Sequence, residues 1–168
     1  MTVTRDDVAR AAVQLEKDGQ AFYLDAAKKA QSELTRKMFT SLADDEVDHI
    51  AWIQKMVPGV DTSTEANRHL YARLSHIFAD VPEGKLRQIA ASGDDVAAIH
   101  TAMGVEKKAV DAYAKWEAEA EEPDVKNLCN VLVGVERFHI QVLTNTLEYL
   151  ERPADWFMQE EQWNFEGA

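Results

Sequence analysis

Six acidic and imidazole residues recur along this chain at a spacing that suits metal binding. Each half holds one Glu and, thirty residues later, a Glu-x-x-His motif, and the second set repeats the first at an offset of ninety residues. Carboxylate oxygens with one imidazole per ion form a donor set that suits iron or manganese. The predicted metal ligands are Glu16, Glu46, His49, Glu106, Glu136 and His139.

The segments around these residues align without a gap. QLEKDGQAFY (14–23) aligns with GVEKKAVDAY (104–113), and DDEVDHI (44–50) aligns with GVERFHI (134–140). Two unrelated amphipathic helices would match at a few Ala and Leu positions, but they would not readily hold the same acids and His in register. The chain is therefore interpreted as two copies of one helical hairpin.

The elements that carry the repeat are predicted to be long helices. The sequence has only seven Gly and four Pro, and it shows no sustained period-two alternation, so we expect no sheet. Short joints near residues 33 and 122 predict two antiparallel hairpins, and the segment 58–93 is long enough to cross the length of a bundle. The predicted helices span about 4–30, 35–56, 94–122 and 123–150, with the first capped by Thr4 and an additional helix around 65–78 in the crossover.

The six residues lie on the apolar faces of these helices. In the second helix, Leu42, Glu46 and His49 follow one another at steps of four and three residues, which is one helical face. Counted from the joints, the acids of the two helices in a hairpin fall at nearly the same depth. Small residues next to the acids of the first and third helices, Gly19 and Ala109, leave room there.

Four carboxylates gathered in a dry core would repel one another, and each ionised group costs several kcal/mol unless it is compensated. Two divalent cations balance the four negative charges and accept the imidazole nitrogens as donors. Glu on two helices and Glu-x-x-His on the other two is the di-iron carboxylate arrangement of ferritin-like bundles. We therefore predict an all-α, ferritin-like four-helix bundle of two antiparallel hairpins over residues 1–152. It would bind two iron ions, for which manganese or zinc could substitute.

Composition excludes several other classes of protein. The formal net charge of −12 argues against binding to nucleic acid or to an anionic membrane. The single cysteine, Cys129, cannot form an internal disulfide, a four-thiolate zinc site, an iron–sulfur site or a rubredoxin-type site. The opening MTVTRDDVAR lacks the apolar stretch of a secretory signal, and no apolar run of about 18 residues occurs, so we expect a cytoplasmic protein.

Several other polar and aromatic residues have an open or a minor role at the predicted metal site. Tyr23 and Tyr113 follow a predicted ligand by two helical turns, so they lie either near the metals or in the ordinary core. Asp45, one turn before His49, could orient that imidazole, although the other half has Val135 at the equivalent position. The remaining histidines are expected to be structural or on the surface: His69, His76 and His100.

The six-residue set resembles the ligand set of the rubrerythrin-like branch of the ferritin superfamily. The ending LEYLERPADWFMQEEQWNFEG also resembles the tail of members that lack a rubredoxin domain. We expect residues 153–168 to form a short helical tail that packs through its aromatic side chains on the bundle or on a partner subunit. The resemblance implies that Glu16 and Glu106 are each a terminal ligand of one iron or swing with redox state. It also implies that Glu46 and Glu136 bridge the two metals and that His49 and His139 each cap one metal.

Two departures from that family bear on activity. Full-length rubrerythrins carry a rubredoxin domain with four cysteines, which this chain cannot form. They also carry an additional Glu one turn after the third-helix ligand, where this chain has Ala109. The remaining ligand set is nearer to that of bacterioferritin-type ferroxidase centres.

The resemblance implies a di-iron redox protein in which hydrogen peroxide or dioxygen accepts one electron from each iron(II). Turnover would need an external electron donor, such as a rubredoxin or a flavoprotein. Two alternatives stay open: a ferroxidase that handles iron in the manner of ferritin, and a non-catalytic helical module that metals merely stabilise. A homodimer or a higher homo-oligomer is plausible for all three.

Overall fold

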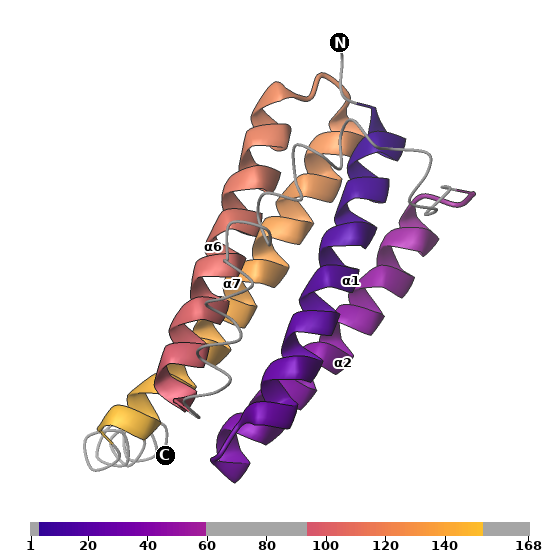
Figure 1. Cartoon of the computed structure of the whole chain (residues 1–168). Coiled ribbons are helices and arrows are strands. Elements are labelled where there is room, and N and C mark those ends of the chain that lie inside the picture. The colour runs from indigo at the N-terminus through magenta and orange to yellow at the C-terminus, as the bar shows by residue number, and fades with distance from the viewer. Residues whose placement is uncertain (1–3, 60–93, 153–168) are drawn as a thin grey trace, which may run out of the picture.

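The computed structural model describes residues 4–59 and 94–152, which form four long helices (Figure 1). The helices are α1 (Arg5–Lys29), α2 (Glu33–Met56), α6 (Asp95–Glu119) and α7 (Pro123–Glu151), and the described residues contain no strand. The predicted all-α four-helix bundle is therefore confirmed. The predicted crossover helix around 65–78 and the tail over 153–168 lie outside the described residues.

Local capping explains where the helices begin. Thr4 and Asp7 form the expected capping box at the start of α1. Ser32 caps α2 by accepting a hydrogen bond from the backbone nitrogen of Thr35, so this helix begins at Glu33, two residues before the predicted start. Asp94 caps α6 in the same way, whereas α7 begins with Pro123, which needs no backbone N–H in the first turn.

Each hairpin is closed by a short connection, and the two hairpins are joined at both ends of the bundle. At one end, Asp95 accepts hydrogen bonds from the backbone nitrogens of Gln31 and Ser32 at 3.0 and 2.8 Å. At the other end, Arg5, which is the repeat equivalent of Asp95, forms an ion pair with Asp124 at 3.6 Å. The first link satisfies backbone donors in a tight turn, whereas the second is largely exposed and contributes little to stability.

The apolar core consists of two clusters separated along the bundle axis. The first gathers residues near the start of α1, the end of α2, the end of α6 and the start of α7, and the second gathers the opposite ends. On every helix, the predicted ligands fall between the residues of the two clusters. The polar layer is thus enclosed by apolar packing above and below, which keeps water away from it.

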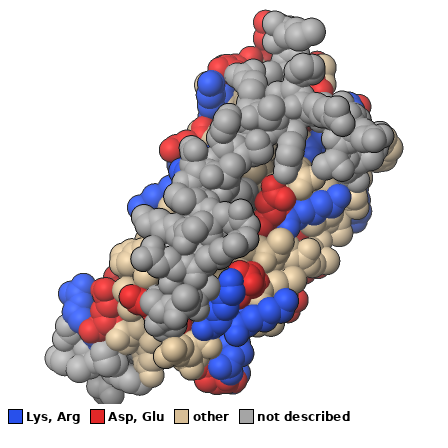
Figure 2. Space-filling model, in the orientation of Figure 1, with Lys and Arg blue, Asp and Glu red and all other residues tan. Residues whose placement is uncertain are grey.

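The described surface is charged and mixed in sign. Figure 2 shows Lys and Arg side chains interspersed with Asp and Glu over the visible part of the described helices. Among the described residues, no helix combines the length and the apolar character needed to cross a membrane.

Candidate metal centre

The bundle brings all six predicted ligands together in one layer. Glu16 comes from α1, Glu106 comes from α6, and α2 and α7 each supply a Glu-x-x-His pair. The four carboxylates and His139 are at most 3% exposed, whereas the His49 side chain is 19% exposed. Such burial of four acids in one place is the unusual arrangement that the repeat predicted.

The side chains form two groups with the spacing of metal ligands. In the first, His49 Nδ1 lies 3.2 Å from Glu16 Oε2 and 3.5 Å from Glu46 Oε2. In the second, His139 Nδ1 lies 3.3 Å from Glu106 Oε1 and 3.6 Å from Glu46 Oε1. Within each group, one donor atom per residue lies within 4.8 Å of the others. The two imidazole rings are stacked, with centroids 5.1 Å apart.

Glu46 and Glu136 are not equivalent in this arrangement, although the repeat predicts that they should be. Glu46 belongs to both groups, and its two oxygens face different imidazoles. Glu136 belongs to neither group found among the described residues, and its nearest imidazole contact is His139 Nδ1 at 3.6 Å. The two halves of the centre therefore contain the same types of ligand but differ in how the Glu of the Glu-x-x-His motif is placed.

The two tyrosines join the centre from opposite hairpins. Tyr23 of α1 donates a hydrogen bond to Glu106 of α6, and Tyr113 of α6 donates to Glu16 Oε1 at 3.3 Å. Each phenol thus reaches the acid on the first helix of the other hairpin. Of the two readings left open by the sequence, contact with the site is the one observed, and these bonds also tie the hairpins together.

Asp45 and His100, which the structure describes, belong to neither ligand group. Within the described residues, His49 Nδ1 contacts carboxylates of Glu16 and Glu46, and Asp45 makes no hydrogen bond to it. His100 is exposed, and the remaining two histidines, His69 and His76, lie outside the described residues. Cys129 is buried in the first apolar cluster, where burial raises the pKa of its thiol to about 11.

Burial and mutual repulsion control the protonation of the four acids. Burial, reinforced by neighbouring carboxylates, raises the pKa of Glu46 and that of Glu136 well above the ordinary range. Burial likewise raises the pKa of Glu106 to about 7. Burial opposes ionisation of Glu16 too, but hydrogen bonds with Glu46 and His49 outweigh it and lower the pKa of Glu16. Without cations, the cluster therefore keeps protons that a divalent ion would replace.

Three polar atoms of the cluster are buried without any hydrogen-bond partner: Glu46 Oε2, Glu136 Oε2 and His139 Nε2. Buried polar groups are seldom left in this state, because each costs about 1–3 kcal/mol. The two carboxylate oxygens are donors that a cation would satisfy, and the oxygen-rich set with two imidazoles suits iron or manganese. The residues present therefore fit a pair of divalent ions.

The family model of Rubrerythrin matches residues 7–147, a stretch that includes all six residues of the centre. The chain belongs to the rubrerythrin family. No match was found among curated proteins or among solved structures. Family membership agrees with the resemblance found in the sequence and with the observed bundle, and it supports metal binding by the carboxylate–imidazole groups.

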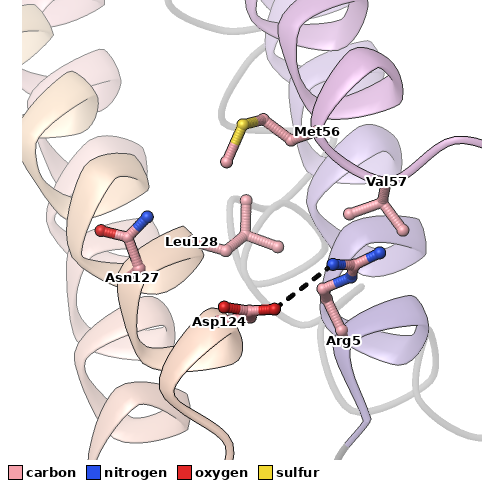
Figure 3. A pocket seen from close by; sticks show the side chains of 6 residues that line it. All are labelled: Arg5, Met56, Val57, Asp124, Asn127 and Leu128. Carbon is pink, nitrogen blue, oxygen red and sulfur yellow. Dashed lines mark ion pairs between the residues drawn. The ribbon is translucent and has the colours of Figure 1, made fainter.

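A pocket lies away from this centre. A pocket of about 170 Å³ at one end of the bundle is lined by the Arg5–Asp124 pair and by Met56 and Leu128, among others (Figure 3). Met56 follows Glu46 by ten residues of α2, which corresponds to roughly 15 Å along the helix. The pocket is therefore separate from the polar layer.

The space expected beside the first-helix acid is occupied by a carboxylate from the second helix. An ideal Cβ at Gly19 would lie 2.9 Å from Glu46 Oε1, closer than real Cβ contacts allow. The signal was available in the repeat, because the equivalent residue of the second half is Ala109. Among the described residues, Gly19 is thus a structural neighbour of the carboxylate that both groups share.

Proposed function

We propose that this rubrerythrin-family chain is a non-haem di-iron protein that reacts iron(II) with hydrogen peroxide or dioxygen. The observation that carries the proposal is the layer of four buried carboxylates and two imidazoles, in which two carboxylate oxygens lack a hydrogen-bond partner. A purely structural polar layer would be expected to satisfy these atoms internally.

Each residue has a definite task in this proposal. Glu16 with His49, and Glu106 with His139, would hold one ion each, while Glu46 serves both. Glu136 would complete the second position from beside His139. When bound, the iron pair supplies the electrons for reducing the oxidant, one from each ion.

The surrounding residues prepare the ligands for this chemistry. The Tyr23 and Tyr113 hydroxyls donate to Glu106 and Glu16, which fixes the orientation of those carboxylates before an ion binds. The apolar clusters on either side exclude bulk water, which strengthens the attraction between the carboxylates and cations.

The proposal includes an external electron donor and a self-associating protein. The sequence has one cysteine, which is buried, so the chain as printed cannot form a four-thiolate iron site of its own. A rubredoxin or a flavoprotein would supply electrons, and the proposed assembly is a homodimer or a higher homo-oligomer.

The test is peroxide consumption by the reduced, iron-loaded protein, compared with the Glu46→Ala variant and with free iron(II). We expect consumption well above that of free iron and a loss of at least tenfold in Glu46→Ala. A rate equal to that of free iron, and unchanged in Glu46→Ala, would refute the redox activity.

A ferroxidase is the second candidate, favoured by Ala109. This buried residue stands where full-length rubrerythrins have an additional Glu, and it provides no ligand. A ferroxidase would oxidise added iron(II) in excess of two ions per chain, and a ferritin-like cage would appear as a very large particle in light scattering. A third candidate, a metal-stabilised module, would bind zinc as readily as iron and show no oxidant-dependent absorbance.

A further inference from the structure

Gly19 occupies a position where glycine is costly. It lies inside α1, one turn after Glu16, and is buried. Its backbone is helical, so no special conformation calls for glycine there. Glycine within a helix is less stable than alanine, since it loses more conformational freedom on folding. A close approach by another group is the remaining physical reason for its presence.

That group is the Glu46 carboxylate of α2. A Cβ at position 19 would meet Glu46 Oε1 at 2.9 Å and Glu46 Cδ at 3.2 Å. Oε1 is also the atom that lies 3.6 Å from His139, on the other hairpin. The contacted atoms are the end of the Glu46 side chain, so an added Cβ would displace this carboxylate and move Oε1 from its place near His139.

The second hairpin has the opposite arrangement. Ala109, the repeat equivalent of Gly19, does carry a Cβ and is buried. Glu136, the repeat equivalent of Glu46, belongs to neither ligand group among the described residues. The hairpin with glycine at this position thus has the carboxylate that belongs to both ligand groups, whereas the hairpin with alanine has the carboxylate that belongs to neither.

We propose that Gly19 is a positioning residue, which admits the Glu46 carboxylate to the place where it serves both candidate cation positions. The two positions are consequently unequal, because the second depends on a carboxylate from the first hairpin. This inference rests on the proposed metal binding but not on a particular redox reaction.

The experiment uses the full chain and manganese(II) as the probe, with calorimetry for stoichiometry and affinity and electron paramagnetic resonance for coupling between ions. We expect the unmodified protein to bind two ions per chain with an exchange-coupled spectrum. In Gly19→Ala, we expect the affinity for the second ion to fall at least tenfold, with the coupled spectrum replaced by that of isolated manganese. Two coupled ions bound within twofold of the original affinities would overturn the proposal.

Gly134→Ala is the matched control. Gly134 also lies within a helix near the centre, two residues before Glu136, but an added Cβ there meets nothing within 4 Å. This variant gains the same helical preference, so we expect unchanged manganese binding and a slightly raised melting temperature. An equal loss of the second ion in both variants would assign the effect to the helix backbone and refute the role of Gly19.

A shorter side chain at position 46 provides the rescue. Asp at this position withdraws the carboxylate from position 19 and should itself weaken the second ion, but adding Gly19→Ala to Glu46→Asp should cost less than a further twofold in affinity. If Gly19→Ala still costs tenfold in that background, it does not act through Glu46. This background also keeps the comparison decisive if Gly19→Ala alone does not fold, as judged by circular dichroism of the metal-free protein.

Failure of the proposed function gives a different result. If the unmodified protein binds neither manganese nor iron, the metal centre itself is refuted, and the role of Gly19 falls with it. If the unmodified protein binds two ions but Gly19→Ala behaves in the same way, only the inference about Gly19 is wrong.

Discussion

The metal-free protein should lose stability as pH rises from 5 to 8, and Glu106 gives the size of the smallest effect. Burial raises the pKa of this carboxyl from 4.5 to about 7 in the folded state. Between these values the folded chain binds a proton that the unfolded chain releases, so the free energy of unfolding falls with increasing pH. At about 1.4 kcal/mol for each pH unit, the interval corresponds to about 3 kcal/mol.

The neighbouring acids act in the same direction. The raised pKa values of Glu46 and Glu136 extend the loss to higher pH, because both side chains stay protonated in the fold after their unfolded counterparts have ionised. The lowered pKa of Glu16 has the opposite sign, but its stabilising effect is lost only as pH falls below the ordinary carboxyl range. Between pH 5 and 8, the sum is therefore a decrease.

The assay is urea unfolding followed by circular dichroism, in the presence of a chelator, at several pH values. Glu106→Gln is the decisive variant, because its amide oxygen can still accept the Tyr23 hydrogen bond but the side chain no longer titrates. We expect its unfolding free energy to change less steeply with pH, by about 3 kcal/mol over the range. A stability that is flat or rising with pH in the unmodified protein, or an identical slope in Glu106→Gln, would refute this reasoning.

Three further predictions concern the contacts that hold the centre in place. Tyr113→Phe removes the hydroxyl that donates to Glu16 and should lower the unfolding free energy of the metal-free protein by about 1–3 kcal/mol in urea titrations; an unchanged value would mean that the bond contributes nothing. Phe39→Ala, at a fully buried ring stacked on Tyr23, should cost about 3–5 kcal/mol in the same assay, and a cost below 1 kcal/mol would contradict the packing. Manganese at one hundred times its dissociation constant should stabilise the protein by about 2.7 kcal/mol per site, seen as a higher melting temperature that a chelator reverses; a melting temperature indifferent to both would argue against the centre.

Much of the fold and of the centre could be predicted because the sequence contains two copies of the same helical hairpin. The scarcity of Gly and Pro predicted long helices, and the offset of ninety residues without a gap paired equivalent helices of the two halves. The placement of Glu46 and His49 on an apolar face predicted that their side chains point into the bundle. The helix α2 begins at Glu33 instead of the predicted Thr35, because Ser32 caps it by accepting a hydrogen bond from the Thr35 backbone, a contact that is local in sequence.

The repeat could not predict how the two hairpins contact each other, or the differences between its copies. Whether Tyr23 contacts the centre depends on the rotation of α1 against α6, a relation between the hairpins that spacing within one helix does not encode. Likewise, the close approach of Glu46 Oε1 to Gly19 is a detail of side-chain placement that helical periodicity does not resolve. The expected tail and the crossover helix stay predictions, because they lie outside the described residues.

The unequal use of Glu46 has a consequence for partial opening of the bundle. Packing within each hairpin is more extensive than packing between them, so separation of the hairpins is the cheapest large movement available to the described helices. The first hairpin would keep all three members of its group, Glu16, Glu46 and His49. The group of Glu106 and His139 would lose Glu46, which belongs to the other hairpin. The two cations should therefore leave in a fixed order, with the one nearest His139 departing first.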